Sequence, residues 1–254
     1  MIKIFRQIRQ NIVMENSKSA RYFKYAIGEI ILVVIGILIA LWINNLNINN
    51  EQNKERLALT ANIKQELNEN LNQFNYRIKR LDDVNKNLIK VLNFSATSST
   101  NEPLDSLKSY VTNVLIIEVP KLNNSRISGA KSSGKFSLLS EKMTTSLTDY
   151  ETYVTNYLRF IDITNSYFDE DWSHLIIRFN SLENFHNVSY PETNLLGHPE
   201  LVLNEQALID YLKEPETYQL LHKYYTKFMI EKAWLKELKC RIESTLEIIK
   251  KESL

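Results

Sequence analysis

The segment Ile30–Ile43, IILVVIGILIALWI, carries no polar side chain over fourteen residues. Three further apolar residues precede Glu29, so the run reaches eighteen residues with a single interruption. An α-helix of that length spans about 27 Å, which is close to the thickness of the hydrocarbon core of a bilayer. Soluble helices are rarely apolar on every face over about four turns. The segment therefore predicts one transmembrane helix over residues 26–43.

The flanks of this segment support an uncleaved anchor. Tyr22 and Tyr25 precede it and Trp42 closes it, as aromatic side chains do at membrane interfaces. A buried core helix and a cleaved signal peptide are the two alternatives. A cleavage site needs small residues in an A-x-A-like pattern, which residues 39–42 (Ile-Ala-Leu-Trp) do not supply.

Charge on the two sides predicts the orientation. Residues 1–25 carry six basic side chains and one acid, whereas Lys54 and Arg56 are offset by two glutamates within residues 44–60. Basic flanks stay in the cytoplasm. We therefore expect a protein of the bacterial inner membrane with residues 1–25 in the cytoplasm and residues 44–254 in the periplasm.

Three small side chains lie on one face of the predicted membrane helix: Gly28, Gly36 and Ala40. Such a face lets a second helix approach closely, which predicts a homo-oligomer or a membrane-protein partner within the lipid bilayer. Glu29 lies beside this face. An intramembrane carboxylate is a candidate functional group because its burial is costly. The alternative is that Glu29 lies within about a turn of the interface and reaches water.

The sequence in and around this segment resembles a known family. Three strings carry the resemblance: YAIGEI at Tyr25–Ile30, LVVIGILIAL at Leu32–Leu41 and INN at Ile43–Asn45. Together they are similar to the hallmark of an uncharacterised family of bacterial membrane proteins that is abundant in Bacteroidota (domain of unknown function 6090). The resemblance implies membrane anchoring and no known activity.

A second family feature resembles Ser132–Lys135 followed by two leucines at 138 and 139. Two departures are present. Residues 46–48 are Leu-Asn-Ile where the family commonly has Trp-Asn-Glu, and Tyr150-Glu151 stands where paired tyrosines are usual. The resemblance therefore covers residues 1–50 well and implies little about residue roles beyond them.

The composition of the remaining chain favours an all-α domain. Only five glycines and five prolines occur among 254 residues, which indicates long helices rather than many short strands. From residue 44 onward there are 25 basic and 28 acidic residues. A near-neutral domain lacks the basic field that nucleic-acid binding needs. We therefore expect no nucleic-acid partner.

Apolar residues recur at intervals of three, four or seven in three segments, each of which predicts an amphipathic helix. The three stripes are Leu67, Leu71, Phe74, Ile78, Leu81, Leu88 and Leu92; Leu147, Tyr150, Val154, Tyr157, Ile161, Phe168, Leu175 and Phe179; and Leu221, Phe228, Leu235, Ile242 and Ile249. Such helices bury their stripes most simply in an antiparallel bundle with coiled-coil-like long helices.

The boundaries follow from the helix breakers. The first helix should end at residues 95–101, and Pro103 should begin a short helix that stops before residue 120. Val114–Ile117 is alternatively a strand. Residues 121–135 are expected to form a loop, and Ser140 to cap a helix reaching about residue 183. After a loop over residues 185–203, Asn204 should begin a helix that residue 215, a proline, interrupts or restarts.

Residues 129–135 (GAKSSGK) match seven positions of a phosphate-binding P-loop. The eighth position should be Ser or Thr and is Phe136, and no strand leads into the motif. We expect instead a flexible loop that docks Phe136 and Leu138 into the bundle.

Other polar groupings also lack an essential member. Asp171 with His174 and Glu183 with His186 have helical metal-ligand spacing, but both pairs lie along one helix, and a solvated acidic face explains them better. The several tyrosines of residues 150–225 either pack in the core or line a pocket. Cys240, the lone cysteine, is expected to be a buried free thiol, with an intermolecular bridge as the alternative.

We therefore expect no enzymatic activity, no cofactor and no metal. The predicted function is a membrane-anchored helical interaction or scaffold protein of the bacterial cell envelope. The alternative is a sensor whose outer bundle binds a small ligand. Because only about 25 residues remain in the cytoplasm, such a sensor would signal through a separate partner.

Overall fold

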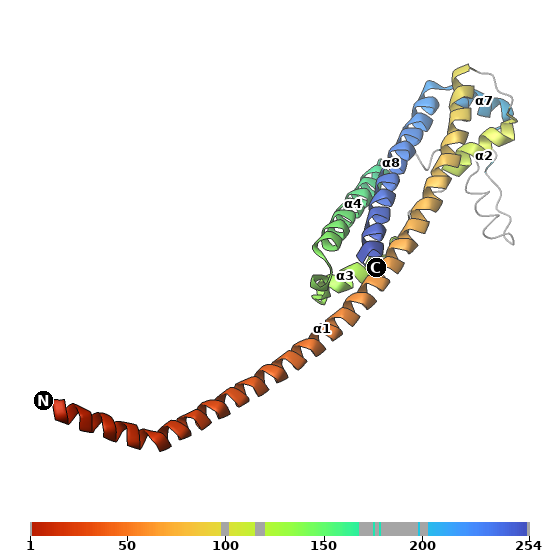
Figure 1. The fold of residues 1–254 in the computed structure, drawn as a ribbon. Helices are drawn as coiled ribbons and strands as arrows, with labels where there is room; N and C mark the ends of the chain where they lie inside the picture. The colour runs from red at the N-terminus through yellow and green to blue at the C-terminus, as the bar shows by residue number, and fades with distance from the viewer. Residues whose placement is uncertain are drawn as a thin grey trace. The chain divides into compact units, whose positions relative to one another are not determined.

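The structure is a computed structural model that describes residues 2–97, 102–114, 120–167 and 203–252, together with Leu175, Arg178 and His198. Before residue 25 it describes the backbone and the side chain of Tyr22 only. Within these residues there are six α-helices and one short 3-10 helix (Figure 1): α1 (Ile2–Thr97), α2 (Leu104–Val114), α3 (Ser125–Ser132), η1 (Lys135–Leu138), α4 (Glu141–Ser166), α7 (Glu205–Lys213) and α8 (Pro215–Glu252). The all-α prediction is confirmed.

The chain divides into two compact units, Met1–Ala58 and Leu59–Leu254. Helix α1 supplies the described part of the first unit and the first long helix of the second. The asparagine-rich segment 44–50 stays helical within it. Asparagine disfavours a helix by well under 1 kcal/mol per residue, so several asparagines do not by themselves end one.

Three long helices, α1, α4 and α8, form most of the second unit, in which α8 runs antiparallel to both of its neighbours (Figure 1). Ser146 contacts Thr245 and Lys227 contacts Asn165, which sets the direction of α8 along α4. Lys239 contacts Asn75 and Lys232 contacts Asp82, which sets the same direction along α1. Helices α1 and α4 consequently run parallel to each other, and the shorter α7 packs against α8.

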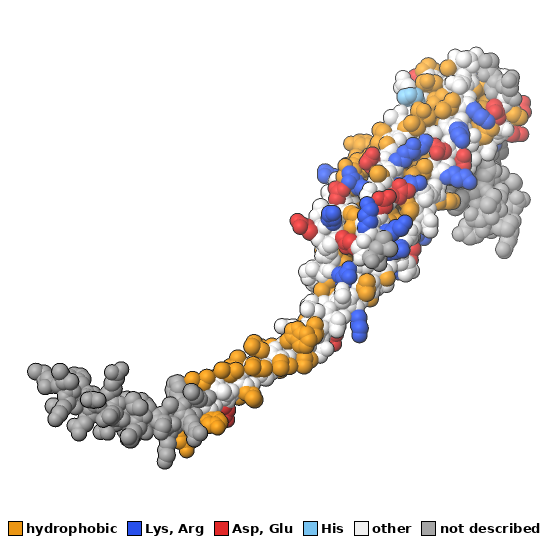
Figure 2. Space-filling view, viewed as in Figure 1, with side chains coloured by type: hydrophobic (Ala, Val, Ile, Leu, Met, Phe, Trp, Pro, Cys, Tyr) orange, Lys and Arg blue, Asp and Glu red, His pale blue; other side chains and the backbone are white. Residues whose placement is uncertain are grey.

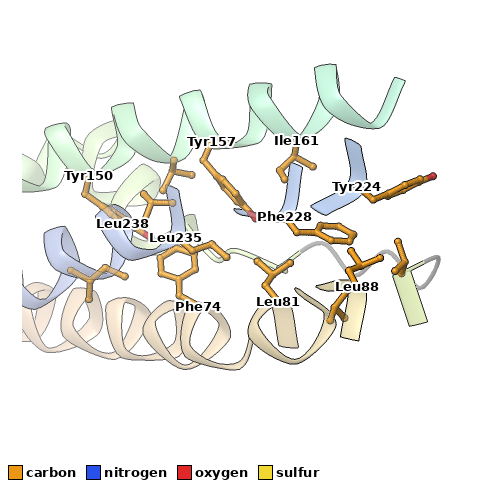
Figure 3. Close-up of a cluster of buried hydrophobic side chains, with 14 of the residues drawn as sticks. Phe74, Leu81, Leu88, Tyr150, Tyr157, Ile161, Tyr224, Phe228, Leu235 and Leu238 are labelled. Atoms are coloured by element: carbon orange, nitrogen blue, oxygen red, sulfur yellow. The ribbon is translucent and has the colours of Figure 1, made fainter. Parts of the chain in front are cut away.

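The core lies between these helices and is built from the predicted stripes (Figure 3). The described members of the second and third stripes are buried, and those of the first are buried or packed against the core. Figure 3 shows Leu81 and Leu88 of α1 beside the aromatic rings of α8. Burial of a large apolar side chain contributes about 1.5–3 kcal/mol. The 3.6-residue periodicity therefore identified the core correctly.

The helix ends also follow the sequence signals. Ser140 Oγ accepts a hydrogen bond from the Met143 N–H at 3.2 Å, and Asn204 Oδ1 accepts one from the Ala207 N–H at 2.9 Å. Both are N-caps that satisfy an otherwise unpaired donor of the first turn. Pro215 is the first residue of α8, where its missing N–H costs nothing.

Four expectations are wrong. The predicted loop over 121–135 contains α3, an eight-residue helix, because α3 obtains its N-terminal hydrogen bonds from α1. The Cys240 thiol is exposed and free. In the docking segment Phe136 is partly buried as expected, but it is Leu139, and not Leu138, that is buried in the core. The helix predicted to reach about residue 183 ends earlier, because α4 stops at Ser166 with Tyr167 as its C-cap. The proposed strand from Val114 lies mostly outside the described residues.

Candidate functional site

The apolar part of α1 has every side chain exposed. It belongs to a helix long and apolar enough to cross a membrane, and none of its apolar window is buried. Figure 2 shows hydrophobic side chains covering this stretch, with little charge among them. Water does not tolerate an apolar surface of this length in a stable soluble helix. This segment thus has the length and composition of a membrane anchor or a signal sequence.

The small face of this segment is open. A Cβ atom added at Gly28 or at Gly36 would meet nothing within 4 Å. Ala40 is exposed, and so is Glu29. The backbone along these positions is therefore accessible to another helix.

The second unit contains a buried ion pair between α1 and α8. Arg77 donates two hydrogen bonds to Glu231, Nε to Oε1 at 2.7 Å and a terminal nitrogen to Oε2 at 3.0 Å. Tyr157 of α4 donates its hydroxyl proton to the same carboxylate at 3.4 Å. The pKa of Tyr157 is raised, chiefly by burial and then by the Glu231 charge. One carboxylate thus joins all three long helices.

A second polar group fixes the chain segment before α3. Asn70 Nδ2 donates to the Asn123 carbonyl at 2.8 Å, and the Asn123 N–H donates back to Asn70 Oδ1 at 2.9 Å. The same Nδ2 donates to the Tyr150 hydroxyl at 3.0 Å. A side-chain amide that pairs with both backbone groups of one residue replaces the partners that this extended segment lacks.

Glu66, one turn earlier on α1, caps α3. Its buried carboxylate accepts the backbone N–H groups of Arg126 at 2.7 Å and Ile127 at 3.3 Å. Burial raises the pKa of Glu66, although these two hydrogen bonds act in the opposite direction. A carboxylate at a helix N-terminus also faces the positive end of the helix dipole.

Asn85 differs from these groups because its buried amide has no hydrogen-bond partner among the described residues. A polar group in that situation costs about 1–3 kcal/mol of stability.

A seam of aromatic side chains runs along the outside of α4 and α8. The Trp234 ring lies 6.0 Å from the Tyr153 ring and 6.3 Å from the Phe160 ring, measured between centroids. Two exposed apolar side chains, Ile163 of α4 and Ile230 of α8, lie farther along the same two helices. We call these five residues the aromatic seam.

The candidate chemical motifs have structural roles. Lys131 of the P-loop-like segment forms an ion pair with Glu151 and lies 5.0 Å from the centre of the Phe136 ring. Gly134 provides the left-handed turn into η1 at φ 73°. These groups join α3 and η1 to α4.

The described residues contain no group of three or more His, Cys, Asp and Glu side chains able to hold a metal ion. Both predicted metal pairs lie outside them. His222 is exposed and its ring stacks on that of Tyr218. The tyrosines that were candidates for a pocket divide between roles: Tyr150, Tyr157 and Tyr224 are buried in the core, whereas Tyr167 is exposed.

Sequence reasoning missed the buried polar contacts, although a signal was present. Asn70 and Arg77 lie seven residues apart, in register with Ile63 and Val84, which are both buried. Polar side chains at the apolar positions of a heptad are candidates for buried polar pairs. Their partners lie far away in the chain, so the pairing itself was not predictable.

In comparisons with family models, with curated proteins and with solved structures, no match to this chain is found. The resemblance to the Bacteroidota family therefore stays a prediction.

Proposed function

We propose that this chain is a membrane-anchored interaction protein of the bacterial cell envelope, held by α1 in the inner membrane with its helical bundle in the periplasm. The observation that supports it most is the exposed apolar window of α1, none of which is buried. The charge asymmetry of residues 1–25 supports the orientation. The resemblance to a family of anchored proteins agrees with both.

The character of the buried polar groups favours binding over catalysis. The polar side-chain atoms of Glu231, Glu66 and Asn70 form hydrogen bonds that join different helices or chain segments. Catalytic acids and bases instead face a cleft that admits a substrate. The half-buried aromatic seam and the exposed small face of α1 remain available, and both suit contact with other helices.

Crosslinking in native membranes tests this proposal. Cells producing the full chain with a C-terminal affinity tag are treated with a short crosslinker, and the captured proteins are identified by mass spectrometry. The untagged chain is the control. A discrete set of captured envelope proteins, or further copies of this chain, is expected. A monomer carrying a stoichiometric small molecule between its helices would refute the proposal and favour a ligand sensor.

A further inference from the structure

The asparagine-rich part of α1 follows the apolar segment and precedes the second unit, which begins at Leu59. Five of its seven residues, 44–50, are asparagine, and all seven are exposed. Their side chains form no hydrogen bond or ion pair with the rest of the described chain. Asparagine is a weak helix former, and a helix that is polar on every side persists only with partner groups. A second helix that contacts these amides would supply such groups.

Two of these asparagines belong to a regular stripe of α1. Ile43, Asn47 and Asn50 are separated by four and then three residues, which is the spacing of the contact positions in a coiled coil. Gly36 and Ala40 precede them with the same alternation, and all five residues are exposed. The stripe is free of charge over about 21 Å of helix. It can therefore lie against another helix without burying a charge.

The opposite side of the segment is less suited to a helix contact. Asn45 and Asn49 lie there, about half a turn away from Asn47 in either direction. They share that side with the bulky ring of Trp42, which suits a membrane interface, and with the charged Arg56. The stripe through Asn47 and Asn50 is consequently the face available for close approach.

The membrane anchor limits how a second copy can meet this stripe. Under the proposed function, α1 crosses one membrane in the same direction in every copy. Neighbouring copies of α1 are then parallel, and identical residues lie at the same depth. Both bundles remain on the same side of the membrane in such a pair.

An asparagine is complementary to its own copy in that arrangement. Its amide has both a donor, Nδ2, and an acceptor, Oδ1, so two facing amides can donate to each other. An asparagine at a contact position also specifies the register of paired helices. Lys54, four residues beyond Asn50, would instead face a like charge. The contact therefore ends between Asn50 and Lys54.

We propose that the partner of this stripe is a second copy of the chain, paired in parallel and in register along α1, with Asn47 and Asn50 each facing the same residue of the other copy. This inference rests on the proposed membrane anchoring and specifies one partner of the anchored protein. A second copy is favoured over an unrelated protein because the anchor alone already gives it this direction and register.

Disulfide formation in native membranes tests which side of α1 forms the contact, because facing positions of a parallel pair lie close enough to be bridged. In a Cys240→Ser background, Asn47→Cys and Asn50→Cys should each give a disulfide-linked dimer under mild oxidation. Asn45→Cys and Asn49→Cys are the matched controls, since they replace the same exposed residue type on the other side of the same segment. They should form at least about tenfold less dimer on non-reducing gels.

Opposite charges test the register. Asn47→Asp or Asn47→Lys alone places like charges opposite each other and should weaken pairing. When full chains carrying N47D and N47K are produced together with different tags, the mixed pair should exceed the two like pairs by about tenfold or more. Chains carrying N45D and N45K are the control and should pair at random.

Equal crosslinking from the two sides of α1, crosslinking at positions 45 and 49 alone, or random pairing of N47D with N47K would overturn the inference. Capture of other envelope proteins together with any of these results would leave the broader proposal intact, and only the second-copy contact would fall. Absence of the wild-type chain from the membrane fraction would instead refute the anchoring on which both rest.

Discussion

Arg77 and Glu231, separated by 154 positions in the sequence, form a two-point ion pair with side chains that are only 6% and 1% exposed. Removing one member leaves the other charged and buried. Glu231→Leu should therefore lower the free energy of unfolding by about 3–5 kcal/mol. Urea unfolding of the detergent-solubilised chain, followed by circular dichroism, measures the loss.

The double variant R77M/E231L is the matched control for that experiment. Replacing both members with apolar side chains of similar size removes the cost of two buried charges, so most of the lost stability should return. If the double variant is as unstable as the single one, packing rather than charge explains the effect.

The Glu66 cap predicts a pH dependence of stability. Burial raises the pKa of Glu66 in the folded chain above its usual 4.5, so the folded state holds the proton more tightly than the unfolded state. The contribution of Glu66 to stability is then greatest below about pH 4.5 and falls as pH rises through the folded pKa. Glu66→Gln should flatten this part of the profile in thermal unfolding. Glu237→Gln, at an exposed position of α8, should leave it in place.

Two glycines offer a paired test of backbone conformation. Gly134 has φ 73°, and Gly129 lies in the middle of α3; a Cβ added at either meets nothing within 4 Å. Gly134→Ala should lower stability by about 1 kcal/mol, because an L side chain is strained in that region. Gly129→Ala should raise it by roughly 0.5–1 kcal/mol through helix propensity. If both substitutions changed the free energy of unfolding equally in chemical unfolding, the backbone conformation of the two glycines would not be the cause.

The small face of α1 is tested by Gly36→Ile. If a second helix touches this face, the substitution should weaken association of the isolated segment by about 1 kcal/mol or more. Leu38→Ile, on the opposite side of the helix, is the control that conserves apolar character. A membrane reporter assay in which both variants behave like the wild type would assign the face to lipid.

Membrane orientation can be read from the native thiol, since Cys240 is exposed. An impermeant maleimide added to intact spheroplasts should label the wild-type chain, and the Cys240→Ser variant should remain unlabelled. Phe5→Cys in that background should react only after the cells are opened. Labelling at position 5 with protection at position 240 would reverse the predicted topology.

The sequence predicted the helices well because periodic burial is a local property. The heptad from Leu221 to Ile249 and the caps at Ser140 and Asn204 needed no knowledge of distant residues. Helix α3 was missed because three serines and a glycine among its eight residues have little helical preference of their own. Cys240 was predicted to be buried because cysteines in general are often buried. Its position in the heptad instead places it on the exposed side of α8.

The dependence of α3 on Glu66 bears on the order in which the protein folds. A helix of eight residues is too short to persist alone, and its capping group lies some sixty residues earlier in the chain. Its amide protons should therefore gain protection only when α1 has docked. Hydrogen exchange across α3 would then report on assembly of the whole bundle, and α3 would behave as part of its cooperative folding unit.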